Sequence, residues 1–264
     1  MKNLFLLWYR RLGWRGFSRL WKLLKPSDGL LISRSKSGVK FLVNPFDYID
    51  THVILDGEYE SEVWREASGL LPANGVVWDI GANMGVFALS LERARPDAQI
   101  IAFEPNVAMA SRLFRNVVLN QSRVQICCLA LSQRCGAASF FVMPGNSGMS
   151  TLIPWGEAGH YEKVIVPLVT GDSLIAGGLC VVPNLLKMDV EGAEEFVLRG
   201  MGGVLKCEDL TCILFEGGPD VIGGASPVSK LLAENGFAIR RLVRNEPTHH
   251  ALENFLAVRP KVKS

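Results

Sequence analysis

The chain has 264 residues, 48% of them apolar, and a formal net charge of +2 at pH 7. This length suits one generous domain or a domain with an appendage. The near-neutral charge argues against a protein that binds nucleic acid through a broad basic surface. The six cysteines form no C-x-x-C pair and have no zinc-site spacing with the four histidines. We therefore expect a reducing, cytoplasmic setting.

Residues 1–25 form a basic and aromatic segment ahead of the rest of the chain. It contains seven Lys or Arg residues and no acid. Its apolar start is too short for a membrane span, and no signal-peptide cleavage site follows. One face of a helix would carry an apolar stripe opposite the basic residues, namely Trp14, Phe17, Trp21 and Leu24. Such a helix is expected to lie peripherally on the inner face of an anionic membrane. The alternative is a helix packed against the rest of its own chain.

Residues 26–75 are interpreted as an entrance or cap segment ahead of the main domain at residues 76–264. Residues 30–43 alternate loosely around Ser37-Gly38, which predicts a β-hairpin. Residues 61–71 have the pattern of a helix that leads into the first core strand. The sequence leaves open whether this segment covers a ligand site or merely caps the sheet.

Residues 76–105 contain, in order, a predicted strand, a glycine turn, a helix, a second strand and an acidic residue. The rest of the chain is interpreted around this unit. A short apolar run ends at Asp79, the turn contains Gly81 and Gly85, and a second apolar run ends at Glu104. This order is typical of a nucleotide-binding βαβ unit. The two glycines permit a sharp turn and close approach of a ligand, and the acid can accept hydrogen bonds from both ribose hydroxyls.

The glycine spacing distinguishes between cofactors. A dinucleotide site has the pattern G-x-G-x-x-G, whereas this turn has G-x-x-x-G with Asp79 before its first glycine. A carboxylate there would repel a pyrophosphate but suits a ligand that carries an ammonium and a sulfonium. The motif therefore predicts S-adenosylmethionine (SAM) as cofactor and makes an NAD-dependent oxidoreductase the less favoured hypothesis.

The middle of the chain continues the alternation of helices and strands. We expect a helix over residues 107–119, with Leu113, Val117 and Val118 facing inward, and a strand over residues 124–129. This strand ends at Ala130-Leu131, a small apolar pair that could support an adenine ring. An ordinary strand-to-turn transition is the alternative there.

A long loop follows the strand that we expect at residues 138–142. Residues 143–160 are rich in Gly, Ser and Pro. Loops of this length inside a compact domain are usually functional. We interpret this one as a lid or a substrate-recognition loop.

The last part of the chain predicts another extended run, two more strands of the sheet and then a closing pair. The extended run lies at residues 164–168 and the two strands at 185–190 and 212–215, with a helix expected to begin at Glu191. The final two strands, at residues 237–243 and 254–258, have no helix between them. This pattern describes a doubly wound, mostly parallel sheet whose last strand is antiparallel.

In such a sheet, ligands bind at the carboxyl ends of the parallel strands. That edge gathers the glycine turn, Glu104, Ala130-Leu131 and a set of candidate bases. The candidate bases are Asp189, Glu191 and Glu216, with His249 from the late loop. For Glu191 and Glu194 there is a structural alternative, because acids are favoured in the first turn of a helix by its dipole.

Three acids so close together would repel one another without a positive charge among them. Lys187 shares a strand face with Asp189, but its tip is expected about 6–7 Å lower along the strand. A divalent cation such as Mg²⁺, bound by Asp189 and Glu216, is the alternative source of that charge.

Several strings resemble the FkbM family of SAM-dependent methyltransferases. The most specific is Lys-Met-Asp-Val-Glu-Gly-Ala-Glu at residues 187–194. The others are VWDIGANMG at 77–85, FEP at 103–105 and NFLAV at 254–258, joined by GEYE at 57–60, ALS at 130–132, GMSTL at 148–152 and TGDSL at 170–174. The likeness covers about residues 45–259 and leaves the basic N-terminus outside. Trp78 and Gly171 depart from the family pattern.

The resemblance implies a class I, Rossmann-like methyltransferase fold with a seven-stranded sheet, to which the patterns ahead of it add an N-terminal helical and hairpin extension. It also implies O-methylation of a hydroxyl on a sugar or a polyketide. A methyltransferase that acts on RNA, protein or another small molecule is the alternative. By analogy, the methionine end of SAM would be held by Asp79, Gly81, Asn83 and Gly85, the ribose by Glu104 and the adenine by Ala130 and Leu131. Ser150, Glu194 and His250 are the residues assigned to the acceptor.

Overall fold

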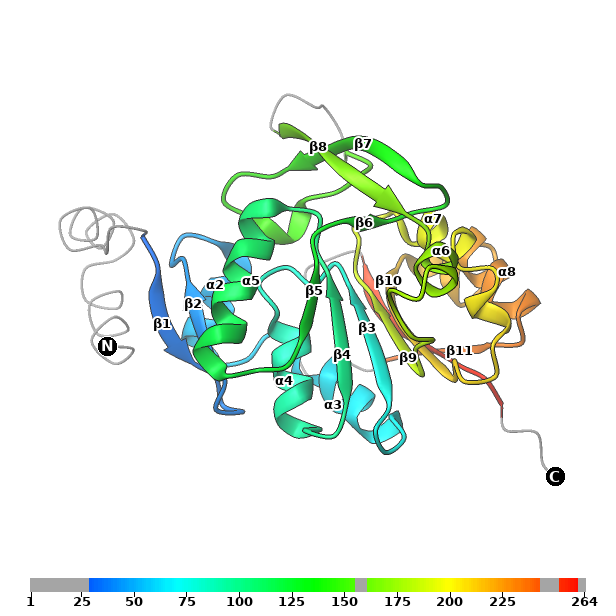
Figure 1. The fold of residues 1–264 in the computed structure, drawn as a ribbon, viewed down its shortest axis with the longest axis horizontal. Coiled ribbons are helices and arrows are strands. Elements are labelled where there is room, and N and C mark those ends of the chain that lie inside the picture. The colour runs from blue at the N-terminus through cyan, green and yellow to red at the C-terminus, as the bar shows by residue number, and fades with distance from the viewer. Residues whose placement is uncertain (1–28, 155–160, 243–251, 261–264) are drawn as a thin grey trace.

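The computed structural model describes residues 29–154, 161–242 and 252–260, and its centre is a seven-stranded sheet (Figure 1). The strand order is β11-β12-β10-β9-β3-β4-β5. The strands are β3 (Val76–Ile80), β4 (Gln99–Phe103), β5 (Gln125–Cys127), β9 (Leu185–Met188), β10 (Cys212–Gly217), β11 (Ala238–Arg241) and β12 (Glu253–Val258). Strand β12 runs antiparallel to both neighbours, and the other pairs are parallel. The predicted α/β class, the mostly parallel sheet and its antiparallel last strand are confirmed.

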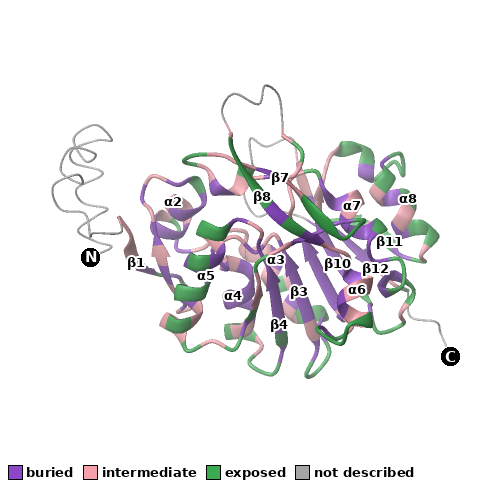
Figure 2. Cartoon of the chain, turned by 45° about the horizontal axis from the view of Figure 1, so that its top comes forward, coloured by how far each residue is buried: buried purple, intermediate pink, exposed green. Residues whose placement is uncertain are grey.

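Helices cover both faces of this sheet. One face packs against α2 (Tyr48–Leu55), α3 (Ser61–Leu70), α4 (Val86–Ala94) and α5 (Val107–Asn120), and the other against α6 (Gly171–Ala176), α7 (Glu194–Arg199) and α8 (Pro227–Glu234). Successive strand residues alternate between the two cores, so Val77 belongs to the first and Trp78 to the second. The central strands are therefore buried along most of their length (Figure 2).

The entrance segment contains the predicted hairpin and one helix that was not predicted. Strands β1 (Leu31–Arg34) and β2 (Lys40–Val43) pair antiparallel, and α3 fills the predicted helix at residues 61–71. The additional helix is α2, whose N-cap Asp47 accepts hydrogen bonds from the backbone N–H groups of the first turn. A buried ion pair between Asp50 and Arg112 ties α2 to α5.

A second, three-stranded sheet lies at the carboxyl edge of the first. Its order is β6 (Ala130–Leu131), β8 (Glu162–Val169) and β7 (Gly136–Val142). Because β6 follows the end of β5 by two residues, this sheet stands over the edge where ligands bind in doubly wound folds (Figure 1). Short 3-10 turns complete the described elements at Ser147–Met149 (η1), Val204–Lys206 (η3) and Pro219–Val221 (η4).

Two local expectations were wrong. The helix expected from Glu191 begins only at Glu194, because Glu191 and Gly192 adopt positive φ angles of 54° and 93° that cannot continue a right-handed helix. In α5, Leu113 is fully buried, but Val118 is 61% exposed. Residue 118 lies five positions beyond 113, which turns it away from the buried stripe.

Some predictions concern parts of the chain outside the described residues. These are the basic helix at residues 1–25, the end of the long loop, and the candidates His249 and His250. Within the described ranges, none of the helices has the length and apolar character that crossing a membrane requires.

Candidate active site

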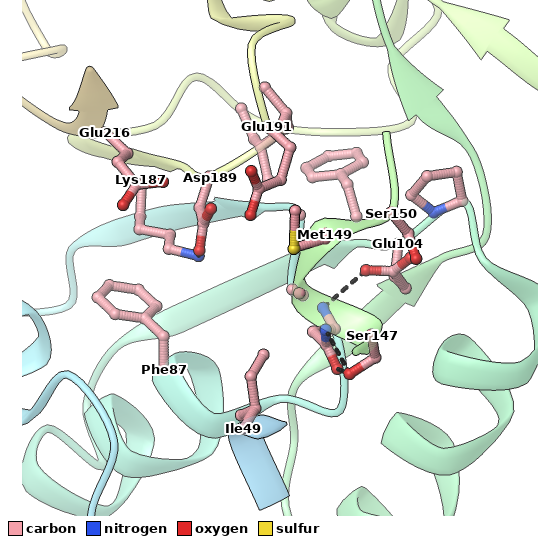
Figure 3. A pocket seen from close by; sticks show the side chains of 18 of the residues that line it. Ile49, Phe87, Glu104, Ser147, Met149, Ser150, Lys187, Asp189, Glu191 and Glu216 are labelled. Atoms are coloured by element: carbon pink, nitrogen blue, oxygen red, sulfur yellow. Dashed lines mark hydrogen bonds and ion pairs between the residues drawn. The ribbon is translucent and has the colours of Figure 1, made fainter. Parts of the chain in front are cut away.

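A cavity of about 360 Å³ opens at the carboxyl edge of the sheet. Its walls come from the β3–α4 turn, the ends of β4, β9 and β10, strand β6, the entrance segment and the loop around η1 (Figure 3). Segments from most of the chain therefore converge on one space.

The glycine turn between β3 and α4 packs closely against other segments of the protein. Gly81 has a φ of +81°, and a Cβ there would lie 1.9 Å from the backbone oxygen of Asp189. Gly85 has a φ of +91°, and a Cβ would lie 2.3 Å from Leu113 Cδ1. Gly81 lines the cavity, whereas Gly85 is not among the described lining residues. Gly81 is thus required for close contact between two backbone segments, and Gly85 is favoured by its positive φ, whereas the sequence pattern had linked both to a turn and a ligand.

Glu104 is a buried acid held by backbone donors at the end of β4. Its Oε2 accepts from Asn83 N at 2.7 Å, and its Oε1 accepts from Asn106 N at 2.8 Å. Burial raises the pKa of this carboxyl to about 7, and the two hydrogen bonds oppose that rise. Glu104 lines the cavity together with Asn83, Ala130 and Leu131.

Lys187 links two aspartates at the centre of the site. Its Nζ lies 3.5 Å from Asp79 Oδ1 and 3.2 Å from Asp189 Oδ2. Asp79 is completely buried, and burial raises its pKa while Lys187 opposes the rise. Burial also works against the charge of Lys187, but Asp189 and Asp79 together hold its pKa above the ordinary value. The lysine is therefore a shared counter-ion for both carboxylates.

The expectation that Lys187 could not reach Asp189 was wrong. Lys187 pairs with Asp79 across β9 and β3, and its flexible side chain extends toward the strand's carboxyl end. Its ammonium also lies 5.8 Å from the centre of the Phe87 ring. The positive charge that the neighbouring acids require thus comes from the chain itself.

Three carboxylates form a group on the same side of the cavity as Lys187 (Figure 3). Asp189, Glu191 and Glu216 each present an oxygen, and these atoms all lie within 4.8 Å of one another. Glu191 is held in the left-handed region, a costly conformation for a residue with a Cβ. Burial, followed by the charges of Asp189 and Glu194, raises the pKa of Glu191 to about 8.

The entrance segment contributes residues that the sequence did not assign to the site. Tyr48, Tyr59 and Glu60 line the cavity. Burial raises the pKa of the Tyr59 hydroxyl, and the charges of Glu60, Asp189 and Glu216 raise it further. The only sequence signal was the Gly-Glu-Tyr-Glu string, whose Glu60 adopts a positive φ of 47° where it starts α3.

The described part of the long loop docks onto the site. Ser147 N donates to Asp47 Oδ2 at 2.8 Å, and Asn83 Nδ2 donates to Ser147 Oγ at 3.2 Å. Thr151 Oγ1 donates to the backbone oxygen of Glu191 at 2.8 Å. Ser150 lines the cavity, and its hydroxyl accepts from Met143 N at 3.2 Å. These bonds connect the loop to the entrance helix, the glycine turn and the acidic strand tip.

Not every predicted site residue reaches the cavity. Of the described candidates, Asp79, Gly85 and Glu194 do not line it. Glu194 Oε1 instead accepts from Val190 N at 3.2 Å, and burial raises the pKa of this carboxyl to about 7. This hydrogen bond, made within the turn that contains Glu194, supports the structural alternative, in which the acid stabilises the start of a helix.

Comparison with known proteins places the chain among methyltransferases. The Methyltransferase FkbM domain matches residues 79–220. Hexuronic acid methyltransferase AglP of Haloferax volcanii is 30% identical over 199 residues, which is 73% of this chain and 77% of that protein. Methyltransferase sdnD of Sordaria araneosa is 33% identical over 160 residues, which is 50% of this chain. This chain spans 62% of sdnD, less than two thirds of its length.

Among solved structures the likeness is remote. Pyrococcus horikoshii TYW2 in complex with MeSAdo is 12% identical, with a TM-score of 0.47, and the match covers 89% of this chain and 72% of that one.

Proposed function

The chain belongs to the FkbM methyltransferase family, and from this premise we propose that it methylates a hydroxyl group of a sugar, with SAM as donor. The sugar would be part of a glycan, a glycolipid or a glycosylated natural product. The observation that carries the proposal is one cavity in which a glycine turn and a buried acid face a lysine-bound aspartate.

The donor half of the cavity comprises Gly81, Asn83, Glu104, Ala130 and Leu131. These residues fit SAM, since Glu104 keeps lone pairs for ribose hydroxyls beyond the two hydrogen bonds that it accepts. Ala130 and Leu131 are small, buried and suited to a flat ring. When bound, SAM supplies an activated methyl group on sulfur.

The acceptor half comprises Lys187, Asp189, Glu191 and Glu216. We assign Asp189 as the general base that takes the proton from the acceptor hydroxyl, an effect typically worth 10²- to 10⁴-fold. Lys187 holds the Asp189 carboxylate in place through their 3.2 Å contact. The larger contribution would come from residues of the cavity that hold the acceptor hydroxyl close to the methyl group that SAM would supply.

The entrance segment and the long loop would close the cavity around the acceptor. Tyr59 and Glu60 of the entrance segment line the cavity, as do Ser147 and Ser150 of the loop. The hydrogen bond from Ser147 N to Asp47 joins the two. We therefore retain residues 26–75 as a cap on the methyltransferase domain at residues 76–264, and Ser150 as an acceptor-binding residue.

The position of Lys187 weakens the hypothesis of a bound divalent cation. The Mg²⁺ hypothesis arose because three acids needed a positive charge, and Lys187 provides one. Asp189, Glu191 and Glu216 do present oxygens close enough to share an ion. We propose that turnover uses the positive charge of Lys187 and requires no divalent cation, which chelation tests directly.

Two measurements test the proposed function. Calorimetry should detect binding of SAM and none of NAD, and the opposite result would exclude a SAM-dependent enzyme. Mass spectrometry of glycans and lipids from cells with and without the gene should reveal the loss of one methyl group on a sugar oxygen. A methyl group lost from RNA or protein instead would replace the sugar with a macromolecular acceptor.

Membrane contact through residues 1–25 is a separate proposal, based on the basic and aromatic composition of this segment. The full chain should co-sediment with anionic liposomes, and a form without residues 1–25 should stay in the supernatant. Equal partition of the two forms would refute the contact.

A further inference from the structure

We infer that the Tyr59 hydroxyl binds the acceptor, donating a hydrogen bond to a second oxygen of the sugar beside the hydroxyl that Asp189 deprotonates. This inference rests on the proposed function and adds a residue that selects the acceptor. The observation that carries it is a tyrosine whose ring is fixed at the cavity wall, while its hydroxyl makes no hydrogen bond to any described residue.

Tyr59 lies in a turn that the protein holds by itself. Gly57 in this turn has a φ of +77°, and its backbone oxygen accepts from Lys36 N at 2.9 Å. The next residue, Glu58, accepts two hydrogen bonds from Arg65 Nη2 at 2.8 Å and 2.9 Å. These contacts tie the turn to the β1–β2 hairpin and to α3, so no bound molecule is required to hold it in place.

The aromatic ring of Tyr59 is fixed as well. It packs against the core on the side of α2 and α3, and its centre lies 5.8 Å from the centre of the His52 ring. The following residue, Glu60, has a positive φ of 47°. This conformation costs about 1–3 kcal/mol for a residue with a Cβ. The chain thus accepts local strain in a turn that holds Tyr59 and Glu60 at the cavity wall.

The Tyr59 hydroxyl has no hydrogen-bond partner among the described residues. Its oxygen is also not one of the fully enclosed polar atoms that lack a partner in the described chain, so it is open to the cavity that Tyr59 lines. A polar group enclosed without a hydrogen bond would destabilise the fold, whereas one that faces a cavity can bind a molecule that enters. The hydroxyl is therefore available to a ligand, although the ring is not.

The surroundings make this hydroxyl a hydrogen-bond donor. Burial raises its pKa, and the charges of Glu60, Asp189 and Glu216 raise it further, so the phenol keeps its proton at neutral pH. An ionised carboxylate can only accept hydrogen bonds. Lys187, the one basic residue of the described cavity lining, already contacts Asp189 at 3.2 Å. Tyr59 therefore supplies an O–H group where most of the neighbouring side chains are acceptors.

A sugar suits this combination of a base and a donor. When one sugar hydroxyl gives its hydrogen to Asp189, an oxygen on a neighbouring carbon can accept a hydrogen bond from Tyr59. A simple alcohol has no second oxygen and would leave the Tyr59 hydroxyl without a partner. Sites whose polar groups must be matched by the substrate reject analogues that lack the matching group. Tyr59 should thus favour a sugar over a simple alcohol.

The test uses the full chain, SAM labelled with tritium on the methyl group, and a small-molecule and glycan extract of cells that lack the gene. Initial rates at several dilutions of the extract give an apparent KM for the acceptor. Tyr59→Phe keeps the ring and its contact with His52 but removes the O–H donor. The apparent acceptor KM should rise about threefold to tenfold, the effect of one lost hydrogen bond, while the KM for SAM stays within about twofold.

Two further proteins make the result specific. The matched control is Tyr161→Phe, because Tyr161 lies outside the described cavity lining, and both KM values should stay within about twofold. Replacement of Tyr59 by 4-aminophenylalanine restores a neutral donor, N–H in place of O–H, at the same ring position. It should return the acceptor KM to within about twofold of the value for the unchanged protein, which a purely steric role of the hydroxyl does not predict for Tyr59→Phe.

The remaining outcomes contradict one proposal each. An unchanged acceptor KM in Tyr59→Phe, or a raised KM that 4-aminophenylalanine does not restore, would overturn the inference and leave the proposed function intact. A raised KM for SAM alone would assign Tyr59 to the donor half and would also overturn the inference. If the unchanged protein binds SAM but transfers no label to the extract, the proposed sugar acceptor itself is contradicted.

Discussion

The two halves of the cavity are built by different means. In the donor half, Glu104 is held by backbone N–H groups of Asn83, in the turn between β3 and α4, and of Asn106, two residues after Glu104. In the acceptor half, side chains hold one another, since Lys187 lies between Asp79 and Asp189. The acid of the donor half is thus fixed by the backbone around it, whereas the acids of the acceptor half depend on a side chain that also reaches Asp79 on another strand.

This difference suits an enzyme whose donor site can stay fixed while its acceptor site changes. Backbone hydrogen bonds depend little on which side chains surround them, so a donor site made from them tolerates change elsewhere. Side-chain charges and the loop around Ser147 can change without disturbing that frame. The halves meet where Gly81 packs on the Asp189 backbone, so that contact should matter to both.

The largest effects on kcat and on the Kd for SAM should come from one substitution in each half, which tests whether the two halves act independently. Asp189→Asn should lower kcat by 10²- to 10⁴-fold and leave SAM affinity within a few-fold. Glu104→Gln should do the opposite, raising the Kd for SAM about tenfold through weaker hydrogen bonds and sparing kcat at saturation. Calorimetry and steady-state kinetics measure both. An active Asp189→Asn enzyme would remove this residue from its proposed role.

Gly81→Ala should damage both halves together. Its Cβ would lie 1.9 Å from the Asp189 backbone oxygen, so a strand tip must shift, at a cost of about 2–3 kcal/mol. Thermal unfolding should show a fall of several degrees, with weaker SAM binding and slower turnover. The control is Gly178→Ala, which also has a positive φ but no atom within 4 Å of the added Cβ. If the two changes destabilised the protein equally, the effect of Gly81→Ala would come from backbone strain at a positive φ and not from the clash with Asp189.

A smaller effect concerns the pH dependence of stability in the acceptor half. The pKa of Glu191 is raised from 4.5 to about 8, so the folded state binds its proton more tightly than the unfolded state. This contribution to stability is complete below pH 4.5 and is lost as the pH rises through about 8. Glu191→Gln stays neutral and should lose fewer degrees of Tm between about pH 5 and about pH 8.5 than the unchanged protein. Parallel Tm curves for the two proteins would show that Glu191 titrates normally.

The smallest expected effect is that of chelation. Because Lys187 supplies the positive charge of the acceptor half, EDTA should leave kcat/KM unchanged within about twofold. The assay compares chelated enzyme before and after addition of Mg²⁺. Loss of activity that Mg²⁺ restores would return the cation to Asp189 and Glu216.

Gly81, Asn83 and Glu104 of the donor half could be named from sequence because their geometry is local. A glycine turn between a strand and a helix, followed by an acid after the next strand, constrains its own backbone over about 30 residues. Periodicity likewise predicted the sheet and most helices, because burial on one face leaves a regular pattern. The same local logic placed Asp189 and Glu216 at one edge of the sheet.

Only the tertiary structure decided how the acids at that edge are compensated. Whether Lys187 reaches Asp189 depends on its side-chain rotamer, and its contact with Asp79 depends on the pairing of β9 with β3, neither of which can be read from the spacing of residues. The left-handed turn at Glu191 and the arrival of Tyr59 and Glu60 also depend on contacts between distant segments. Local patterns reflect the backbone that they build, whereas electrostatic neighbours depend on how the whole chain packs.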